Sequence, residues 1–374
     1  MWYNNQMKYF DNASTTKISE NALNAFVSYS NNFYNPSALY AEAVDSKKLI
    51  EDAREFFIKY FKGDKNSTFI FTGCASESNN AVLNSCIIRK DKKYIISAGE
   101  HSSIHNAAKH YLELGYNVVF IPLASNGSID YEVLEGELDS SVALVSVIHV
   151  SNETGAVNDI KKVVELVKKH SPNALIHSDG VQAVGKLDIN LKELGVDFYT
   201  ISAHKIHGPK GIGALYIKNI NKFKPFILGG GQEYNLRAGT ENIPAIKSFE
   251  VAVQDLTKKD FSAHKKAFLD NLSGDYYLVS DVGCVDNIIS ICFAGVRGET
   301  IAHLLESKGY LIGTGSACNS GVKINRVISS IVPKKYAEGA IRISFDDDIT
   351  VQDCIDLAHE LSNAVENYKQ ILKR

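Results

Sequence analysis

Apolar and polar positions follow two patterns along the first two thirds of the chain. Short, nearly continuous apolar runs are typical of buried strands, and stretches with an apolar residue every three or four positions predict helices. Strands are expected at residues 68–71, 94–97, 117–122, 142–150, 174–177, 197–201 and 214–217. Helices are expected at residues 43–61, 76–89, 102–114, 131–138 and 160–170. This alternation predicts an α/β fold with a mostly parallel central sheet flanked by helices.

The pattern changes after Pro244. A long helical stretch is expected to run to about residue 267, followed by short strands within residues 276–293. A helix at residues 299–307, a loop and a final helix with one apolar stripe complete the chain. This mixture predicts a smaller α+β domain. We expect the large α/β domain to cover residues 15–250, and the small one to cover residues 1–14 and 251–374.

Composition narrows the class of protein and its surroundings. A hydrophobic content of 45% and a charged content of 22% are those of an ordinary soluble globular protein. The formal net charge of −3 argues against nucleic acid or a membrane surface as the main partner. The first residues lack the apolar segment of a secretory signal. Six cysteines without a C-x-x-C pair favour free thiols in a reducing cytoplasm over disulfides or a metal site.

The strongest candidate for chemistry is Lys205. It follows an apolar run that ends at Ser202, and Gly208 and Pro209 force turns directly after it. A lysine shielded from water at a strand end has a lowered amine pKa and can attack an aldehyde, as a Schiff-base lysine for pyridoxal phosphate (PLP) must. For this residue alone, a lysine in a surface turn is the alternative interpretation. The glycines do not have the spacing of a phosphate-binding P-loop.

Polar residues also follow other predicted strands. Ser76, His101 and Asn152 each lie just after a strand, and ligands gather at the carboxyl ends of parallel strands. Helix capping and turn formation are the alternative explanations for these three. Asp179 ends a buried strand, where an unpaired carboxylate is costly and a cationic pyridinium nitrogen would be a fitting partner.

The last third adds an unusual thiol and an unusual cation. Cys318 lies in a loop of small residues with no core to pack against, and an exposed thiol of this kind is reactive. Arg342 lies in an otherwise apolar strand and needs an anion, either a substrate carboxylate or an internal ion pair. The glycines at 229–231, with Arg237 and Thr240, suit close approach to an anion or to another chain, or a flexible hairpin.

Four motifs resemble those of the cysteine desulfurases, which are PLP enzymes of the class-V aminotransferase family. They are Asp11-Asn-Ala-Ser-Thr-Thr16, Ser202-Ala-His-Lys205 with Gly208-Pro-Lys-Gly211, Gly229-Gly-Gly-Gln-Glu233 with Arg237-Ala-Gly-Thr240, and Gly315-Ser-Ala-Cys318. The likeness runs nearly end to end and implies the type I fold of PLP-dependent transferases. Departures are also present: Cys74 stands where glycine is usual, and Ser76 where threonine is usual.

The resemblance implies a set of residues that bind PLP. The set is Ala75, Ser76, His101, Asn152, Asp179, Gln182, Ser202, His204, Lys205 and Thr240. Within it, Lys205 would be the Schiff-base lysine, and His101 would stack on the ring and move protons. Asp179 would face the pyridine nitrogen and Gln182 the ring hydroxyl. Ser76, Ser202 and His204 would hold the phosphate, with Thr240 reaching in from the second subunit of a homodimer.

The resemblance also implies a reaction. L-cysteine would be held by Asn152 and Arg342 and converted to L-alanine, with Cys318 taking the sulfur as a persulfide. Twenty-four positions separate Cys318 from Arg342, as in the long loops that deliver sulfur to an acceptor protein for iron–sulfur cluster assembly or for tRNA or cofactor thiolation. Alternatives are a selenocysteine lyase, another class-V lyase or aminotransferase, and a sulfur carrier or scaffold without catalysis.

Overall fold

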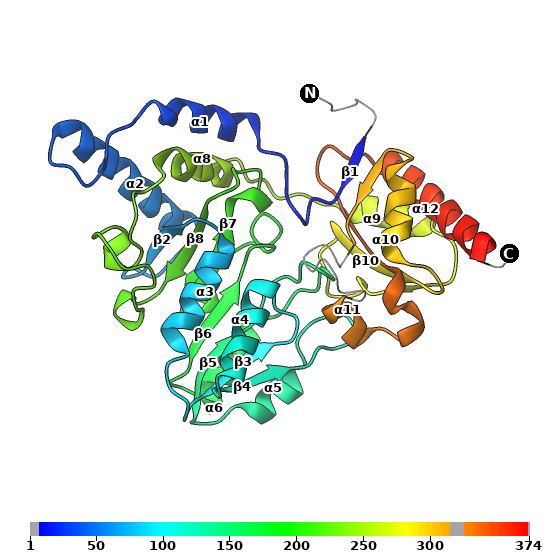
Figure 1. The fold of residues 1–374 in the computed structure, drawn as a ribbon, viewed down its shortest axis with the longest axis horizontal. Helices are drawn as coiled ribbons and strands as arrows, with labels where there is room; N and C mark the ends of the chain where they lie inside the picture. Colours follow the sequence, from blue (N-terminus) through cyan, green and yellow to red (C-terminus); the bar gives the residue numbers. More distant parts are fainter. Residues whose placement is uncertain (1–6, 315–324, 373–374) are drawn as a thin grey trace.

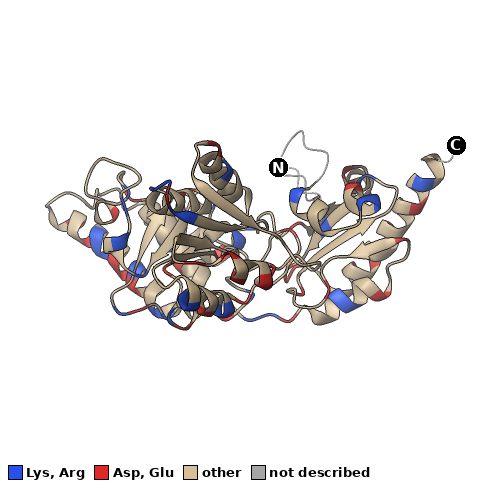
Figure 2. Ribbon diagram, turned by 90° about the horizontal axis from the view of Figure 1, so that it is seen from below, with Lys and Arg blue, Asp and Glu red and all other residues tan. Residues whose placement is uncertain are grey.

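The computed structural model describes residues 7–314 and 325–372. Two bodies lie side by side, one built on a large sheet and one on smaller sheets, and the chain crosses between them near β1 and again after α8 (Figure 1). Within the described residues, no helix is long and apolar enough to cross a membrane. Basic and acidic residues are interspersed over both bodies (Figure 2).

The large body contains a seven-stranded sheet with the order β2-β8-β7-β6-β5-β3-β4. Its strands are β2 (Thr68–Thr72), β3 (Lys93–Ser97), β4 (Asn117–Ile121), β5 (Val142–Ser146), β6 (Leu175–Asp179), β7 (Phe198–Ser202) and β8 (Gly213–Ile217). Strand β8 is antiparallel to both of its neighbours, and the other pairs are parallel. The predicted mostly parallel sheet is confirmed.

Helices cover both faces of this sheet because its strands are apolar on both sides. They are α1 (Glu20–Ser30), α2 (Ala41–Tyr60), α3 (Ala75–Cys86), α4 (Ser102–Glu113), α5 (Tyr131–Glu137), α6 (Ile160–His170), α7 (Leu191–Leu194) and α8 (Ile243–Gln254). On one face Phe57 of α2 packs edge-on against Phe69 of β2 and Phe249 of α8. Burial of such rings fixes the helices to the sheet.

The second body has a three-stranded antiparallel sheet of order β12-β10-β9 and a parallel pair, β1 with β11. Its strands are β1 (Lys8–Phe10), β9 (Tyr276–Leu278), β10 (Ile288–Phe293), β11 (Tyr310–Ile312) and β12 (Ala340–Ser344). Its helices are α9 (Ser262–Asp270), α10 (Gly298–Glu306), α11 (Arg326–Ile331) and α12 (Val351–Leu372). The predicted domain boundaries at residues 15 and 250 stay a prediction.

Two predictions of secondary structure differ from the structure, and one helix was missed. The long helix after Pro244 is two helices, because the chain between Gln254 and Ser262 leaves the helix and Lys259 pairs there with Asp346 at 2.9 Å. The predicted strand at 142–150 ends at Ser146, beyond which the His149 N–H bonds to the carbonyl of Asp179. Helix α1 was not predicted.

Candidate functional site

Lys205 lies at the end of a short 3₁₀ turn, Ala203–Lys205, that directly follows β7. Its Nζ donates to the carbonyl oxygen of Ala13 at 2.7 Å and to that of Ser14 at 2.5 Å. The segment that runs from Asp11 to Thr16, which the sequence motif marked without giving it a role, therefore forms one wall of the site. Backbone carbonyls can hold this amine in place without neutralising it by a carboxylate.

Two further predicted residues meet the same wall. Gln182 is buried, and its Nε2 donates to the carbonyl oxygen of Ala13 at 2.8 Å. His204 Nδ1 lies 3.1 Å from the hydroxyl oxygen of Thr15. Burial and the adjacent Lys205 lower the pKa of His204 to about 4, so its imidazole is neutral near pH 7. A neutral imidazole donates or accepts a hydrogen bond without carrying charge.

Asp179 lies at the end of β6 and is almost fully buried. Its Oδ2 accepts from Asn79 Nδ2 at 2.8 Å and its Oδ1 from the backbone N–H of Val181 at 3.0 Å. Between residues 7–314 and 325–372, Asp179 has no ion-pair partner. A buried carboxylate held by hydrogen bonds alone is positioned to receive a cation.

His101 is joined to Asp179 through two side chains. Asn79 Nδ2 also donates to Ser103 Oγ at 2.9 Å, and that oxygen is 2.9 Å from His101 Nδ1. Because Nδ1 also accepts from the backbone N–H of Ser103 at 3.2 Å, the ring proton is assigned to Nε2. Burial lowers the pKa of His101, the charge of Asp179 opposes this, and that of Lys205 reinforces it. His101 is thus within electrostatic reach of both.

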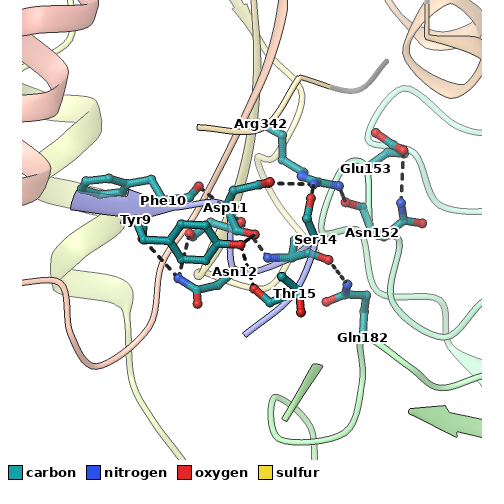
Figure 3. Close-up of polar contacts among 12 residues, drawn as sticks. Tyr9, Phe10, Asp11, Asn12, Ser14, Thr15, Asn152, Glu153, Gln182 and Arg342 are labelled. Carbon is teal, nitrogen blue, oxygen red and sulfur yellow. Dashed lines mark hydrogen bonds and ion pairs between the residues drawn. The ribbon is translucent and has the colours of Figure 1, made fainter. Parts of the chain in front are cut away.

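Arg342 comes from β12 of the second body and reaches into the first (Figure 3). Its Nη1 donates to the carbonyl oxygen of Asn152 at 2.8 Å. Its Nη2 donates to Asp11 Oδ1 at 2.9 Å and to Ser14 Oγ at 2.5 Å. Gly313 packs so closely that a Cβ there would collide with Asp11 Oδ1, so only glycine fits beside the pair.

Both interpretations of Arg342 have support in this geometry. The internal ion pair exists, with Asp11 as its partner. Yet Arg342 Nε is buried and has no hydrogen-bond acceptor within the described residues, which leaves one donor of the guanidinium for an anion. The side chain of Asn152 is not bonded to Arg342; its Nδ2 donates to Glu153 at 3.1 Å (Figure 3).

A candidate anion site lies at the start of α3. Its N-cap residue, Cys74, makes no side-chain capping hydrogen bond, so a ligand can take that role. Gly213 packs so closely that a Cβ there would lie 2.8 Å from the carbonyl carbon of Cys74 and 3.0 Å from Ala75 N. Ser76 is exposed in the first helical turn. Ser202 Oγ is buried and has no partner within the described part of the chain.

Together these features fit PLP. The unpaired carboxylate of Asp179 suits a protonated ring nitrogen, and the α3 N-terminus with the Ser202 hydroxyl suits a phosphate. Lys205 supplies the amine. The donor set is therefore the one that this cofactor requires.

Two predicted site residues are not joined to this group. Thr240 is exposed, and within residues 7–314 and 325–372 no hydrogen bond or ion pair joins it to Lys205 or Asp179. Cys318 lies outside the described residues. Sequence reasoning, for its part, gave no role to Asp11, Ser14 or Asn79. The dense polar run at Asp11–Thr16 was the available signal for the first two.

Comparison with known proteins places this geometry in a family. The family model described as "Aminotransferase class-V" matches residues 8–357. A cysteine desulfurase of Nostoc sp. is 34% identical over 351 residues, which covers 90% of this chain and 87% of that protein. The chain belongs to the class-V aminotransferase family, as a homologue of its cysteine desulfurases.

Two further similar proteins support this assignment. Cysteine desulfurase IscS 1 of Archaeoglobus fulgidus is 34% identical, with coverage of 84% of this chain and 85% of that protein. The solved structure of a NifS-like protein has a TM-score of 0.87 and 29% identity, covering 96% of this chain and 99% of that one. The resemblance and the predicted α/β fold are confirmed. Class-V aminotransferases of this kind are PLP enzymes; the roles of single residues in this one stay predictions.

Proposed function

We propose that this protein is a PLP-dependent cysteine desulfurase that converts L-cysteine to L-alanine and loads Cys318 with the sulfur. The observation that carries the proposal is the convergence of Lys205, Asp179 and His101 at the carboxyl ends of β6 and β7 and the start of α4. An amine, a buried unpaired carboxylate and a neutral imidazole are the groups that this chemistry needs.

PLP, when bound, supplies an aldehyde to which amines add and an aromatic ring that accepts electrons from the substrate α-carbon. Lys205 would join that aldehyde in the resting enzyme. The same amine would serve as the base that moves the proton of the substrate α-carbon, and the carbonyls of Ala13 and Ser14 hold it in place. Asp179 would keep the ring nitrogen protonated, since a buried carboxylate favours a cation beside it.

His101 would stack on the ring and share the proton transfers with Lys205. With Nδ1 accepting from the backbone of Ser103, Nε2 is the atom that carries a proton. Its lowered pKa keeps the ring neutral, so it can stack on the cofactor without adding a second cation beside Lys205. Asn79 holds Asp179 and Ser103 in a fixed relation.

The phosphate would bind at the start of α3, to Ala75 N–H and the hydroxyls of Ser76 and Ser202, with His204 as a further donor. Gln182 would donate to the ring hydroxyl oxygen. Arg342 would hold the substrate carboxylate through its unused Nε donor, beside Asn152. Asp11 keeps Arg342 oriented when no substrate is present.

Cys318 would then accept the sulfur. Its thiolate attacks the sulfur of the bound cysteine, the carbon–sulfur bond breaks, and the substrate carbon takes a proton to become alanine. Cys318 then carries a persulfide, and an acceptor protein takes its outer sulfur. Iron–sulfur cluster assembly and thiolation of tRNA or of a cofactor all use sulfur in this form.

We further propose a homodimer in which Thr240 completes the phosphate site of the partner. Exposed apolar side chains on α1, α2 and the loop between them support an interface: Val27, Phe33, Leu39 and Val44 are 59, 81, 98 and 57% exposed. Leu228, in the same loop region as Thr240, is 84% exposed. Thr240 itself is exposed, as a residue that contacts a second subunit must be in a single chain.

Turnover of L-cysteine by the PLP-loaded protein tests the proposal. Alanine and sulfide are expected in equal amounts in the presence of a reducing thiol. Selenocysteine is the matched comparison, because a selenocysteine lyase would release alanine from it and not from cysteine. Absence of alanine from cysteine, in protein whose spectrum shows bound PLP, would reject desulfurase activity.

A further inference from the structure

A second lysine, Lys186, lies behind the site. It is four residues after Gln182 in the turns that follow β6, and its Nζ donates to Gln182 Oε1 at 3.1 Å. Within the described part of the chain it has no ion-pair partner. Burial of the amine lowers the pKa of Lys186 to about 8, and the more distant charge of Asp346 opposes this only in part. Lys186 as a whole is partly exposed, and the contact of its amine is with a neutral amide rather than a carboxylate, so no ion pair among the described residues explains its position.

The contact with Lys186 determines the orientation of the Gln182 side-chain amide, which could otherwise be turned by 180° with its oxygen and nitrogen exchanged. The ammonium of Lys186 can only donate, so the oxygen must face it. The carbonyl of Ala13 can only accept, so the nitrogen must face it, at 2.8 Å. The same carbonyl accepts from Lys205 at 2.7 Å. The orientation of the Gln182 amide is thus fixed from both ends, with its NH₂ group on the side of the reactive lysine.

We propose that Lys186 is a positioning residue that holds the NH₂ group of Gln182 toward Ala13 and Lys205, and so toward the ring hydroxyl oxygen of PLP. One N–H of that group bonds to Ala13. The second is directed by the same constraint and serves the cofactor oxygen. This inference rests on the proposed function, because the ring hydroxyl is present only when PLP is bound.

Loss of the Lys186 amine has two effects of the same sign. Gln182 is free to turn its oxygen toward the negatively polarised ring oxygen, and a positive charge behind the site is lost. Both changes make the cofactor's own bond to Lys205 easier to protonate. The spectroscopic pKa of bound PLP should therefore rise by about half a unit or more, and PLP affinity should fall about fivefold to tenfold.

The test is a double-mutant cycle between Lys186→Met and Gln182→Leu, read by absorbance titration of bound PLP and by PLP affinity. Lys186→Met alone should shift both the spectroscopic pKa of bound PLP and the PLP affinity. Lys186→Arg keeps a donor, so its PLP affinity should stay within about twofold of that of the natural protein. Lys192→Met is the matched surface control. In the Gln182→Leu background, Lys186→Met should change little more. If Lys186→Met does not fold, Lys186→Gln replaces it in the same cycle.

Two outcomes would overturn the proposal. One is an unshifted spectrum and affinity in Lys186→Met. The other is a shift of equal size with and without Gln182, since Lys186 would then act on its own. Both outcomes bear on Lys186 only when the natural protein binds PLP at Lys205. If it does not, the proposed function fails first, and the two failures are therefore distinguishable.

Discussion

The amine of Lys205 lies 2.7 Å from the carbonyl oxygen of Ala13, 192 positions earlier in the chain. This contact ties the N-terminal segment after β1, a strand of the second body, to the end of β7 in the first. Ser14 continues the connection, because its carbonyl accepts from Lys205 and its hydroxyl from Arg342. This short segment therefore sets the distance between Lys205 and Arg342. In the proposed reaction, Lys205 would act at the α-carbon of the substrate and Arg342 would bind its carboxylate.

Cys318→Ala should abolish sulfide release from L-cysteine and leave PLP binding intact, because the proposed sulfur acceptor is lost and no cofactor contact is removed. The visible spectrum of the bound cofactor and its change on adding L-cysteine should match those of the natural protein. Cys292→Ala is a poor control because that thiol is buried. Cys284→Ala is the suitable control, because that thiol is partly exposed and has no proposed contact with the cofactor or the substrate. Full sulfide release by Cys318→Ala would overturn the role of Cys318.

Arg342→Gln should lower kcat/KM for L-cysteine by about 100-fold or more, mostly through KM, because a guanidinium that pairs with the carboxylate is lost. Asp11→Asn is the companion variant: it keeps the Arg342 donors and an acceptor oxygen at the position 2.9 Å from Nη2, and removes only the negative charge of the internal partner. Its loss should be smaller, below about tenfold. Steady-state kinetics with L-cysteine measure kcat and KM for both variants. An unchanged KM in Arg342→Gln would show that Arg342 has a structural role and does not bind the substrate.

Acidification should destabilise the fold through His177. Burial lowers the pKa of His177 to about 3, against about 6.5 in the unfolded chain. The unfolded state binds the extra proton first, so stability is complete above about pH 6.5 and falls as the pH drops toward 3. At pH 5 the loss from this group is about 2 kcal/mol.

Urea unfolding at pH 7 and pH 5 measures this loss. His177→Asn is the comparison, because it removes the titrating ring from its contacts with Ser146 and Thr200 while other groups keep their own pH dependence. The variant should be less stable at pH 7 but should lose less on acidification. Equal losses in the two proteins would mean that His177 is not held neutral.

Glu233→Ala should destabilise the fold by about 3–5 kcal/mol, because it removes the buried partner of Arg54 and leaves only the exposed Glu51 to pair with this guanidinium. Arg54 Nη1 is 2.8 Å from Glu233 Oε2, and the same oxygen accepts from the backbone N–H of Phe71 at 3.0 Å. Glu77→Ala breaks a pair with Arg237 whose side chains are 23% and 21% exposed, so it should cost less, about 1 kcal/mol. Thermal unfolding of the two variants compares their losses of stability. Equal losses would contradict the claim that the buried ion pair contributes more than the more exposed one.

Periodicity was sufficient for most of the fold. The seven strands of the large sheet were predicted because each is a run of residues buried on both faces, which has no other common explanation in a chain of alternating elements. The break after Gln254 was not predicted. It depends on a contact between Lys259 and Asp346, and nothing in the local pattern contains that long-range pair.

The candidate site was predictable only in part. Asp179 ends a strand and Lys205 and His101 each come shortly after one, so the topology of a parallel sheet brings them together. The partners of Arg342 were not predictable, since Asp11 comes from the other end of the chain. Lys186 gave no signal at all, because a lysine in a turn is ordinary until its amine is found on the amide oxygen of Gln182.

Reduction of the PLP-loaded protein with borohydride, followed by peptide mapping, tests the central claim most directly. We predict a single stable pyridoxyl modification on the peptide that contains Lys205. The Lys205→Ala variant, treated identically, should carry none. A modification on another lysine, Lys186 included, or none on the natural protein, would contradict the assignment of Lys205 as the Schiff-base lysine.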